Sequence, residues 1–136
     1  MLQYGKFRML FTGDAGFETE ARLLHRGVDL AADILKVGHH GSAYASSPAF
    51  LTAVRPRIAI ISVGRHNVFG HPANSTIANL AANGVSIYRT DRYGAVMLSV
   101  DASIRVATML RCSPSSISSL SNGLLLPCAS DEARRF

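Results

Sequence analysis

The sequence predicts a layered α/β domain with a mixed sheet and helices on one face. Short apolar runs that favour strands alternate with segments whose apolar residues recur at helical spacing. Residues 58–63 form a continuous apolar run, which is typical of a strand buried on both faces of a layered sheet. Several of these runs end at a glycine beside a histidine or an aspartate, and sites in such folds gather at strand ends.

The first unit of the chain reads as strand, loop and helix. Residues 7–11 are apolar and favour a strand, and residues 17–25 show apolar positions at helical spacing. Glu18 and Glu20 stand in the first turn of that helix, where the helix dipole favours negative charge. Gly27 follows it as a glycine that ends a helix.

The second unit repeats this order. Residues 33–37 predict a short buried strand, and Ser47 followed by Pro48 is a helix-start signal for a helix that reaches residue 54. Residues 55–57, Arg-Pro-Arg, break that helix before the strand at residues 58–63.

The remaining elements are one helix and three strands. The helix is expected at residues 73–82 or 74–82 and the next strand at residues 85–88. After a turn at residues 90–94, strands at residues 95–100 and 104–110 form an antiparallel meander.

Composition predicts one globular domain over residues 1–111, followed by a serine-rich, flexible tail at residues 112–136. A hydrophobic fraction of 48% excludes wholesale disorder, and no apolar run is long enough for a membrane helix. We therefore expect the chain itself to be soluble. The two cysteines form no metal-binding pattern and receive no role.

Charge favours a polyanionic partner, and DNA is the commonest candidate. The formal net charge is +5, and all nine acidic residues lie outside residues 34–90. That span holds five basic residues, which are Lys36, Arg55, Arg57, Arg65 and Arg89. The alternative is a merely basic soluble protein.

Three strand ends each deliver a group suited to chemistry. His39 and His40 stand between glycines after the second strand, His71 follows Gly70, and Asp14 follows Gly13. Imidazole is the commonest metal ligand and the usual acid or base near neutral pH. Taken alone, an aspartate between glycines is also a common turn former.

These motifs, with residues 60–65, Asn67 and residues 88–91 with Gly94, resemble the second half of a metallo-β-lactamase-fold domain. The version they resemble is the C-terminal domain of ComEC-type DNA-internalisation competence proteins, and the match covers about residues 7–100. The resemblance implies half of an αββα sandwich with one or two Zn or Mn ions, and no small-molecule cofactor. It also implies a bacterial source and a parent protein in the cytoplasmic membrane.

The resemblance assigns roles to particular residues. Asp14 matches a metal-bridging aspartate and His71 the last histidine ligand. His40 is the favoured ligand for the metal or a substrate phosphate, and His39 is the next candidate. Which of the two imidazoles faces the site stays open at this point. Ser42 completes a catalytic group with His39 and His40.

Three further residues are expected around this group. Lys36 and Arg65 each lie near a histidine motif and are candidates for contacts with phosphate oxygens. Surface solubility is the plainer explanation for both. By the same resemblance, Asp91 orients a ligand residue without itself contacting the metal.

One departure from the family limits the prediction. The His-x-His-x-Asp-His cluster of the first half does not occur in this sequence, so too few ligands are present for the usual metal centre. We therefore expect a fragment that is inactive by itself and is completed by a missing N-terminal half or by a second copy. An uncovered sheet face would then be a large apolar surface.

The leading functional hypothesis is a metal-dependent hydrolase acting on DNA phosphodiesters during uptake of transforming DNA. One alternative is a non-catalytic remnant that binds nucleic acid. Another is a different hydrolase of the same fold, such as a lactonase or a thioesterase, because a fold does not fix the chemistry.

Overall fold

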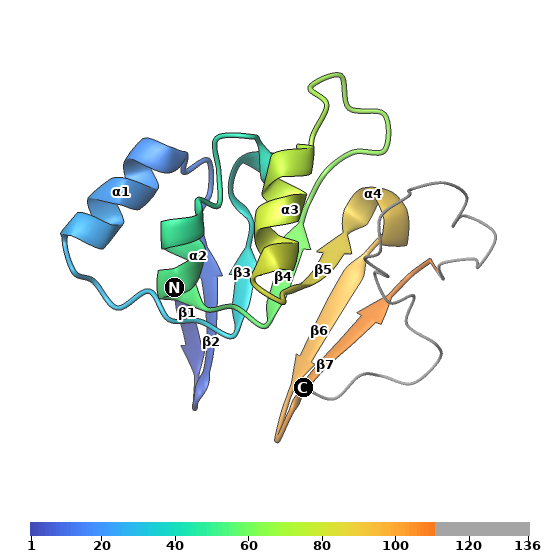
Figure 1. Ribbon diagram of the computed structural model, residues 1–136. Coiled ribbons are helices and arrows are strands. Elements are labelled where there is room, and N and C mark those ends of the chain that lie inside the picture. Colours follow the sequence, from blue (N-terminus) through green and yellow to red (C-terminus); the bar gives the residue numbers. More distant parts are fainter. Residues whose placement is uncertain (111–136) are drawn as a thin grey trace.

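The computed structural model describes residues 1–110, and its centre is a five-stranded mixed sheet (Figure 1). The strands lie in the order of the sequence: β1 (Leu2–Tyr4), β2 (Phe7–Phe11), β3 (Ile34–Lys36), β4 (Ile58–Ile61) and β5 (Ser86–Arg89). Strands β2 to β5 are parallel and β1 pairs with β2 antiparallel. The mixed sheet is confirmed, whereas β1 was not predicted. The tail expected at residues 112–136 lies outside the described residues.

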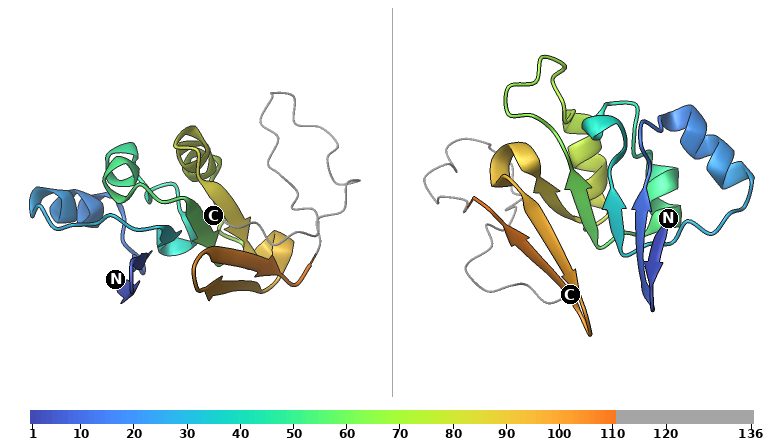
Figure 2. Two further views of the ribbon diagram at one scale, coloured as in Figure 1. Left: turned by 90° about the horizontal axis from the view of Figure 1, so that it is seen from below. Right: turned by 180° about the vertical axis from the view of Figure 1, so that it is seen from behind.

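Three helices cover one face of this sheet, as the sequence predicts. They are α1 (Phe17–His25), α2 (Pro48–Val54) and α3 (Asn74–Ala82), and Figure 2 shows them on the same side. Phe50, Leu51 and Leu80 from the helices pack with Leu35 and Ile61 from the strands in one buried cluster. Among residues 1–110, no helix is both long and apolar enough to span a bilayer.

The opposite face carries a separate hairpin of β6 (Val96–Val100) and β7 (Ile104–Thr108), joined to β5 by the short helix α4 (Thr90–Tyr93). The antiparallel pairing was predicted, but its separation from the main sheet was not. Figure 2 shows the hairpin on the side away from the helices. Ile104 and Val106 pack against Ile34, Ile58 and Ile60. The hairpin therefore covers the β3–β4 part of the face that we expected to be bare.

Strand β1 and the carboxyl end of β2 stay open on the same face, whereas Phe7 and Met9 of β2 are partly buried against this second cluster. The register places Leu2 beside Met9 and Tyr4 beside Phe7, so their side chains share the face opposite the helices. Leu2 is 49% exposed, Tyr4 68% and Phe11 51%. An apolar surface smaller than the whole sheet face thus remains at this side of the molecule.

Candidate functional site at the carboxyl edge of the sheet

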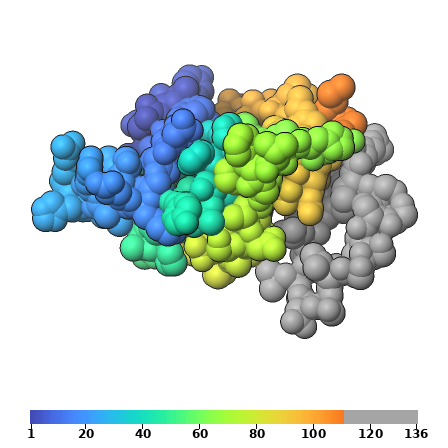
Figure 3. Space-filling model, turned by 90° about the horizontal axis from the view of Figure 1, so that it is seen from above, coloured from blue at the N-terminus to red at the C-terminus, as the bar shows by residue number. Residues whose placement is uncertain are grey.

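The carboxyl ends of the four parallel strands meet at one edge of the sheet, and the loops that follow them contact one another. Figure 3 looks down on this edge, where the blue, teal and lime-green segments lie side by side. Three hydrogen bonds join neighbouring loops. The His39 N–H donates to the Gly13 carbonyl (2.9 Å), the Ala73 N–H to the Gly41 carbonyl (2.8 Å), and the Val63 N–H to the Thr90 hydroxyl (2.8 Å).

The histidine pair is held in a strained backbone. His39 and His40 have φ angles of 46° and 54°, in the left-handed region that costs an L-residue roughly 1–2 kcal/mol. The flanking glycines are required by close packing: a Cβ on Gly38 would lie 2.8 Å from the Ala15 carbonyl oxygen, and one on Gly41 would lie 2.5 Å from Pro72 Cβ. Strain of this kind collects at functional sites.

The two imidazoles point to different partners. The ring of His39 meets the ring of His71 edge to face, with centroids 5.7 Å apart. His40 Nδ1 lies 2.7 Å from the Ser62 carbonyl oxygen, and a carbonyl only accepts, so Nδ1 carries the proton. This leaves His40 Nε2 as the basic nitrogen, which is the arrangement that orients histidine ligands and bases in other sites. Both side chains are exposed.

Lys36 and Asp14 come from neighbouring strand ends. Burial lowers the pKa of the half-buried Lys36 ammonium group, and the negative charge of nearby Asp14 opposes that shift. Lys36 Nζ donates to the Val37 carbonyl oxygen (3.1 Å). Asp14 is exposed. The edge therefore holds a partly desolvated cation and an exposed carboxylate that interacts with it electrostatically.

Ser42 lies beneath the histidines rather than at the surface. Ser42 is 5% exposed. Its hydroxyl accepts a long hydrogen bond from the Tyr44 N–H (3.4 Å), and its carbonyl oxygen accepts from the Thr76 hydroxyl (2.7 Å). These contacts fix the end of the histidine turn to α3. The catalytic role of Ser42 stays a prediction.

Arg65 and Asp91 lie together on the β5 side of the edge. Arg65 Nε donates to the Asp91 carbonyl oxygen (3.2 Å), while both carboxylate oxygens of Asp91 accept from Arg89 (3.0 and 2.6 Å). Asp91 is therefore engaged with Arg89 and ties the exposed Arg65 to this corner of the site. Its predicted part in orienting a ligand remains a prediction.

The predicted metal ligands are only partly brought together. Within residues 1–110, no three His, Cys, Asp or Glu side chains are grouped as a cation would require. The close ring pair is His39 with His71, whereas His40 turns toward Ser62. A complete Zn or Mn site therefore does not fit the described residues alone.

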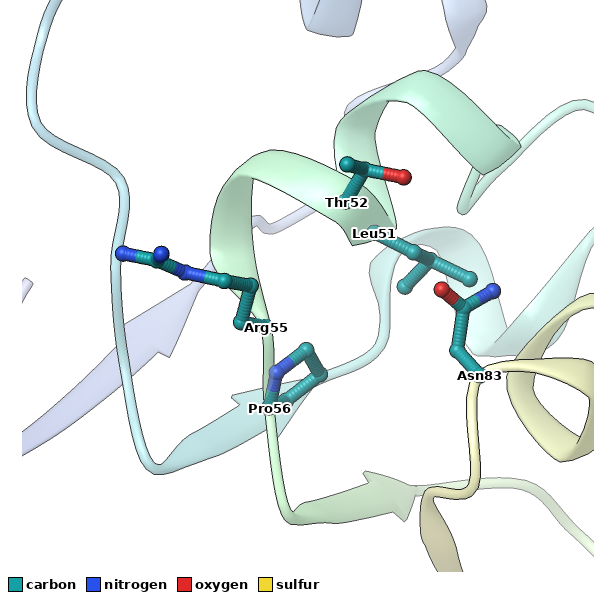
Figure 4. Close-up of a pocket in the computed structure, with 5 residues that line it drawn as sticks. All are labelled: Leu51, Thr52, Arg55, Pro56 and Asn83. Carbon is teal, nitrogen blue, oxygen red and sulfur yellow. The ribbon is translucent and has the colours of Figure 1, made fainter.

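The basic residues of the span 34–90 do not gather at one edge. Arg55 and Arg57 precede β4 and so lie at its amino end, opposite Gly64. A hollow of about 250 Å³ near Arg55 is lined also by Leu51, Thr52, Pro56 and Asn83, with the guanidinium pointing outward in Figure 4. None of the predicted site residues lines it. Of the basic side chains at the histidine edge, Arg89 forms an ion pair with Asp91 (2.6 Å), whereas Lys36 and Arg65 form none with a carboxylate within residues 1–110.

Sequence reasoning missed two parts of this edge. Thr90 binds the Val63 backbone with both its hydroxyl hydrogen and its oxygen, and it thereby holds the loop after β4 against β5. Phe69 stacks on His71 with centroids 6.0 Å apart. No signal in the sequence distinguishes Phe69, because single apolar residues are common at protein surfaces.

Comparison with known proteins gives bacterial competence proteins as relatives. The chain is 33% identical over 95 residues to ComE operon protein 3 of Bacillus subtilis. The matched region spans 70% of this chain and 12% of that protein. It is 38% identical over 93 residues to competence protein ComA of Neisseria gonorrhoeae, spanning 68% of this chain and 14% of that protein. This chain is related to the competence proteins.

The relation covers a small segment of those proteins. Recombination protein 2 of Haemophilus influenzae is 43% identical over 79 residues, or 56% of this chain and 9% of that protein. No family model matches the chain, and no solved structure matches it. The expected link to ComEC-type competence proteins is therefore confirmed, and the metallo-β-lactamase assignment stays a prediction.

Proposed function

We propose that the carboxyl edge of the sheet is part of a site that binds DNA phosphodiesters and, in a completed metallo-β-lactamase-type domain, hydrolyses them during DNA uptake. The observation that carries the proposal is the convergence of neighbouring strand ends: Lys36 and His39 at the end of β3 and His71 after β4 lie at one edge of the sheet. The printed names of the relatives, competence proteins, support the process.

Phosphate recognition falls to the two basic residues of the edge. Arg65 is exposed, and a guanidinium offers paired donors that match phosphate oxygens. Lys36 is half-buried, so its charge acts through less water than a surface lysine would. His40, with its proton fixed on Nδ1, offers Nε2 to accept a proton from a nucleophile or to bind a cation.

We further propose that Asp14, His40 and His71 contribute to a Zn or Mn site whose other ligands lie outside residues 1–110. Such an ion would supply Lewis acidity and an activated water. Because the described residues hold no three-ligand group, we expect the chain by itself to bind nucleic acid without cutting it. The same observation favours non-catalytic nucleic-acid binding as the second candidate function.

The completing polypeptide would also cover the apolar side chains left open on β1 and β2. We favour a further segment of a longer protein over a second copy, because the matched region is 12% and 14% of the first two relatives. Light scattering on the isolated chain tests this choice. A monomer is expected, and a stable dimer that buries Tyr4 would favour the second copy instead.

DNA binding is tested by fluorescence anisotropy with labelled DNA across a salt series. We expect affinity to fall with salt, and the slope of log K against log salt to become shallower by about 0.7–0.9 in Lys36→Met or Arg65→Met. Arg55→Met, at the opposite edge, is the matched control and should leave the slope unchanged. Equal effects of all three substitutions would contradict the proposed site.

Catalysis is tested separately with Zn or Mn and a labelled DNA substrate. No cutting is expected from the isolated chain, whereas cutting is expected after a complementary half-domain with the missing ligands is supplied. Stoichiometric, metal-dependent cutting by the isolated chain would contradict the proposal that another polypeptide completes the site.

A further inference from the structure

The loop after β4 displays its apolar side chains to solvent. Val68 is 89% exposed and Phe69 77%, the highest values among the large apolar side chains of residues 1–110. In Figure 1 this loop, lime green, stands above the carboxyl edge of the sheet. These two adjacent side chains form a small apolar patch, and burying it against a ligand would be favourable.

The base of the loop is fixed, so the exposure is not a consequence of a loose segment. The Asn67 side chain donates to the carbonyl oxygens of Gly64 (3.0 Å) and His71 (2.8 Å), and it accepts from the His71 N–H (2.9 Å). One side-chain amide thus closes the loop on both sides. Residues 68–70 are held out at its tip.

The Phe69 ring extends a series of rings that begins in the site. His39 meets His71 edge to face, and Phe69 stacks on His71 at an interplanar angle of 22° with centroids 6.0 Å apart. One face of the Phe69 ring is therefore directed at His71, and its 77% exposure leaves the other face open. Arg65, at the start of the same loop, is an exposed cation whose Nε donates to the Asp91 carbonyl oxygen (3.2 Å).

We propose that Phe69 is a stacking platform for one unpaired nucleobase, which positions the adjacent phosphate at Arg65 and the histidine rings. Aromatic faces bind bases without regard to sequence, and a neighbouring cation for the backbone is the usual companion. A base in a duplex has both faces covered by its neighbours, so the platform favours single strands. This inference rests on the proposed DNA-binding function and adds to it the form of nucleic acid that the edge accepts.

The test compares two oligonucleotides of equal charge, one with bases and one with abasic residues, each about 12 nucleotides long, within the site sizes of stacking modules. The full chain should bind the base-containing strand about 5- to 150-fold more tightly, the range that corresponds to about 1–3 kcal/mol for a stacked base. Phe69→Ala should remove that preference and leave affinity for the abasic strand unchanged. Phe69→Tyr should keep the preference, because it retains the ring.

A spectroscopic readout separates stacking from a loss of folding. The chain has no tryptophan, so Phe69→Trp places a single indole at the platform. Its fluorescence should be quenched by the base-containing strand and not by the abasic strand. Met97→Trp, on the hairpin at a position that is 60% exposed, is the matched control and should not respond.

The outcomes separate the stacking platform at Phe69 from the DNA-binding function on which it rests. Equal, salt-sensitive binding of both strands overturns the platform and leaves phosphate binding at the edge standing. Binding of neither strand overturns both. A blue shift of the Phe69→Trp emission with anionic phospholipid vesicles, without quenching by DNA, overturns the platform in favour of a membrane contact.

Discussion

At the scale of single residues, the histidine turn combines backbone strain with two imidazole rings that are held by defined partners. His39 and His40 both occupy the left-handed region, and a side chain at position 38 or 41 would collide with the Ala15 carbonyl oxygen or the Pro72 ring, respectively. The sequence predicted a reactive site from the Gly-His-His-Gly pattern. The left-handed geometry, and the different partners of the two rings, follow from contacts with the loops at residues 12–16 and 62–72 and were not predictable from the pattern.

The strain at His39 predicts an inverted preference between alanine and glycine. His39→Gly should be more stable than His39→Ala by about 1 kcal/mol, because both remove the ring and glycine alone accepts a φ of 46° without steric cost. Urea unfolding of the two variants measures the difference. Greater stability of the alanine variant would mean that the turn relaxes to a right-handed conformation.

The burial of Lys36 predicts that the free energy of unfolding changes with pH in the direction opposite to that expected for a salt-bridged lysine. Burial lowers its folded pKa below the unfolded value of about 10.4, so the cost of burying the charge is present at neutral pH. That cost is relieved as pH rises through the folded pKa toward the unfolded one. Stability of the native chain relative to Lys36→Met should therefore increase between neutral and alkaline pH. Unfolding curves of both proteins across that range test it, and a decrease would contradict the burial of the ammonium group.

At the scale of the elements, α1 and α2 are joined by a buried carboxylate. Glu20 is 2% exposed and accepts from the Ser46 N–H (2.6 Å) and the Ser47 N–H (2.9 Å) at the start of α2. The sequence placed Glu20 in the first turn of its own helix, which is correct. Its bonds to the start of another helix depend on how α1 packs against α2, which local patterns do not encode. The cap by Ser47, which accepts from the Phe50 N–H (3.3 Å), was predicted because capping is local.

Glu20→Gln should lower the free energy of unfolding by about 1–3 kcal/mol, because a neutral amide keeps the shape but loses charge-assisted acceptance from two N–H groups. Glu18→Gln is the control within the same helix. Glu18 is exposed and pairs with Arg22, so its loss should stay within about 0.5 kcal/mol. Similar losses in chemical denaturation would show that the effect belongs to the helix dipole rather than to the bonds with α2.

At the scale of the whole molecule, the sheet is covered unevenly. Helices α1 to α3 pack on one face, while the β6–β7 hairpin covers the β3–β4 part of the other and leaves Leu2, Tyr4 and Phe11 exposed. Sequence periodicity predicted both strands of the hairpin. It did not predict which sheet face they pack on, because that depends on the direction in which α4 turns the chain after β5.

Ile104 should be the main anchor of this hairpin. Ile104→Ala is expected to cost about 2–4 kcal/mol, because the side chain is 6% exposed among Ile34, Ile58 and Ile60. Met97→Ala, on the solvent side of the same hairpin, should change stability by less than about 0.5 kcal/mol. Thermal or urea unfolding measures both, and a small effect at Ile104 would mean that the hairpin contributes little to the core.

Local signals in the sequence, which are apolar periodicity, caps and glycines, predicted the α/β class, helices α1 to α3, strands β2 to β7 and the strand ends that carry Asp14, His39 and His71. They predicted a turn at residues 90–94, where the structure has the short helix α4. The tertiary structure decided which groups meet. It paired His39 with His71, turned His40 toward Ser62, buried Ser42 and Glu20, and separated Arg55 from Arg65. These results depend on parallel strands bringing distant segments to one edge, and contacts between segments far apart in the chain leave no periodic trace in the sequence.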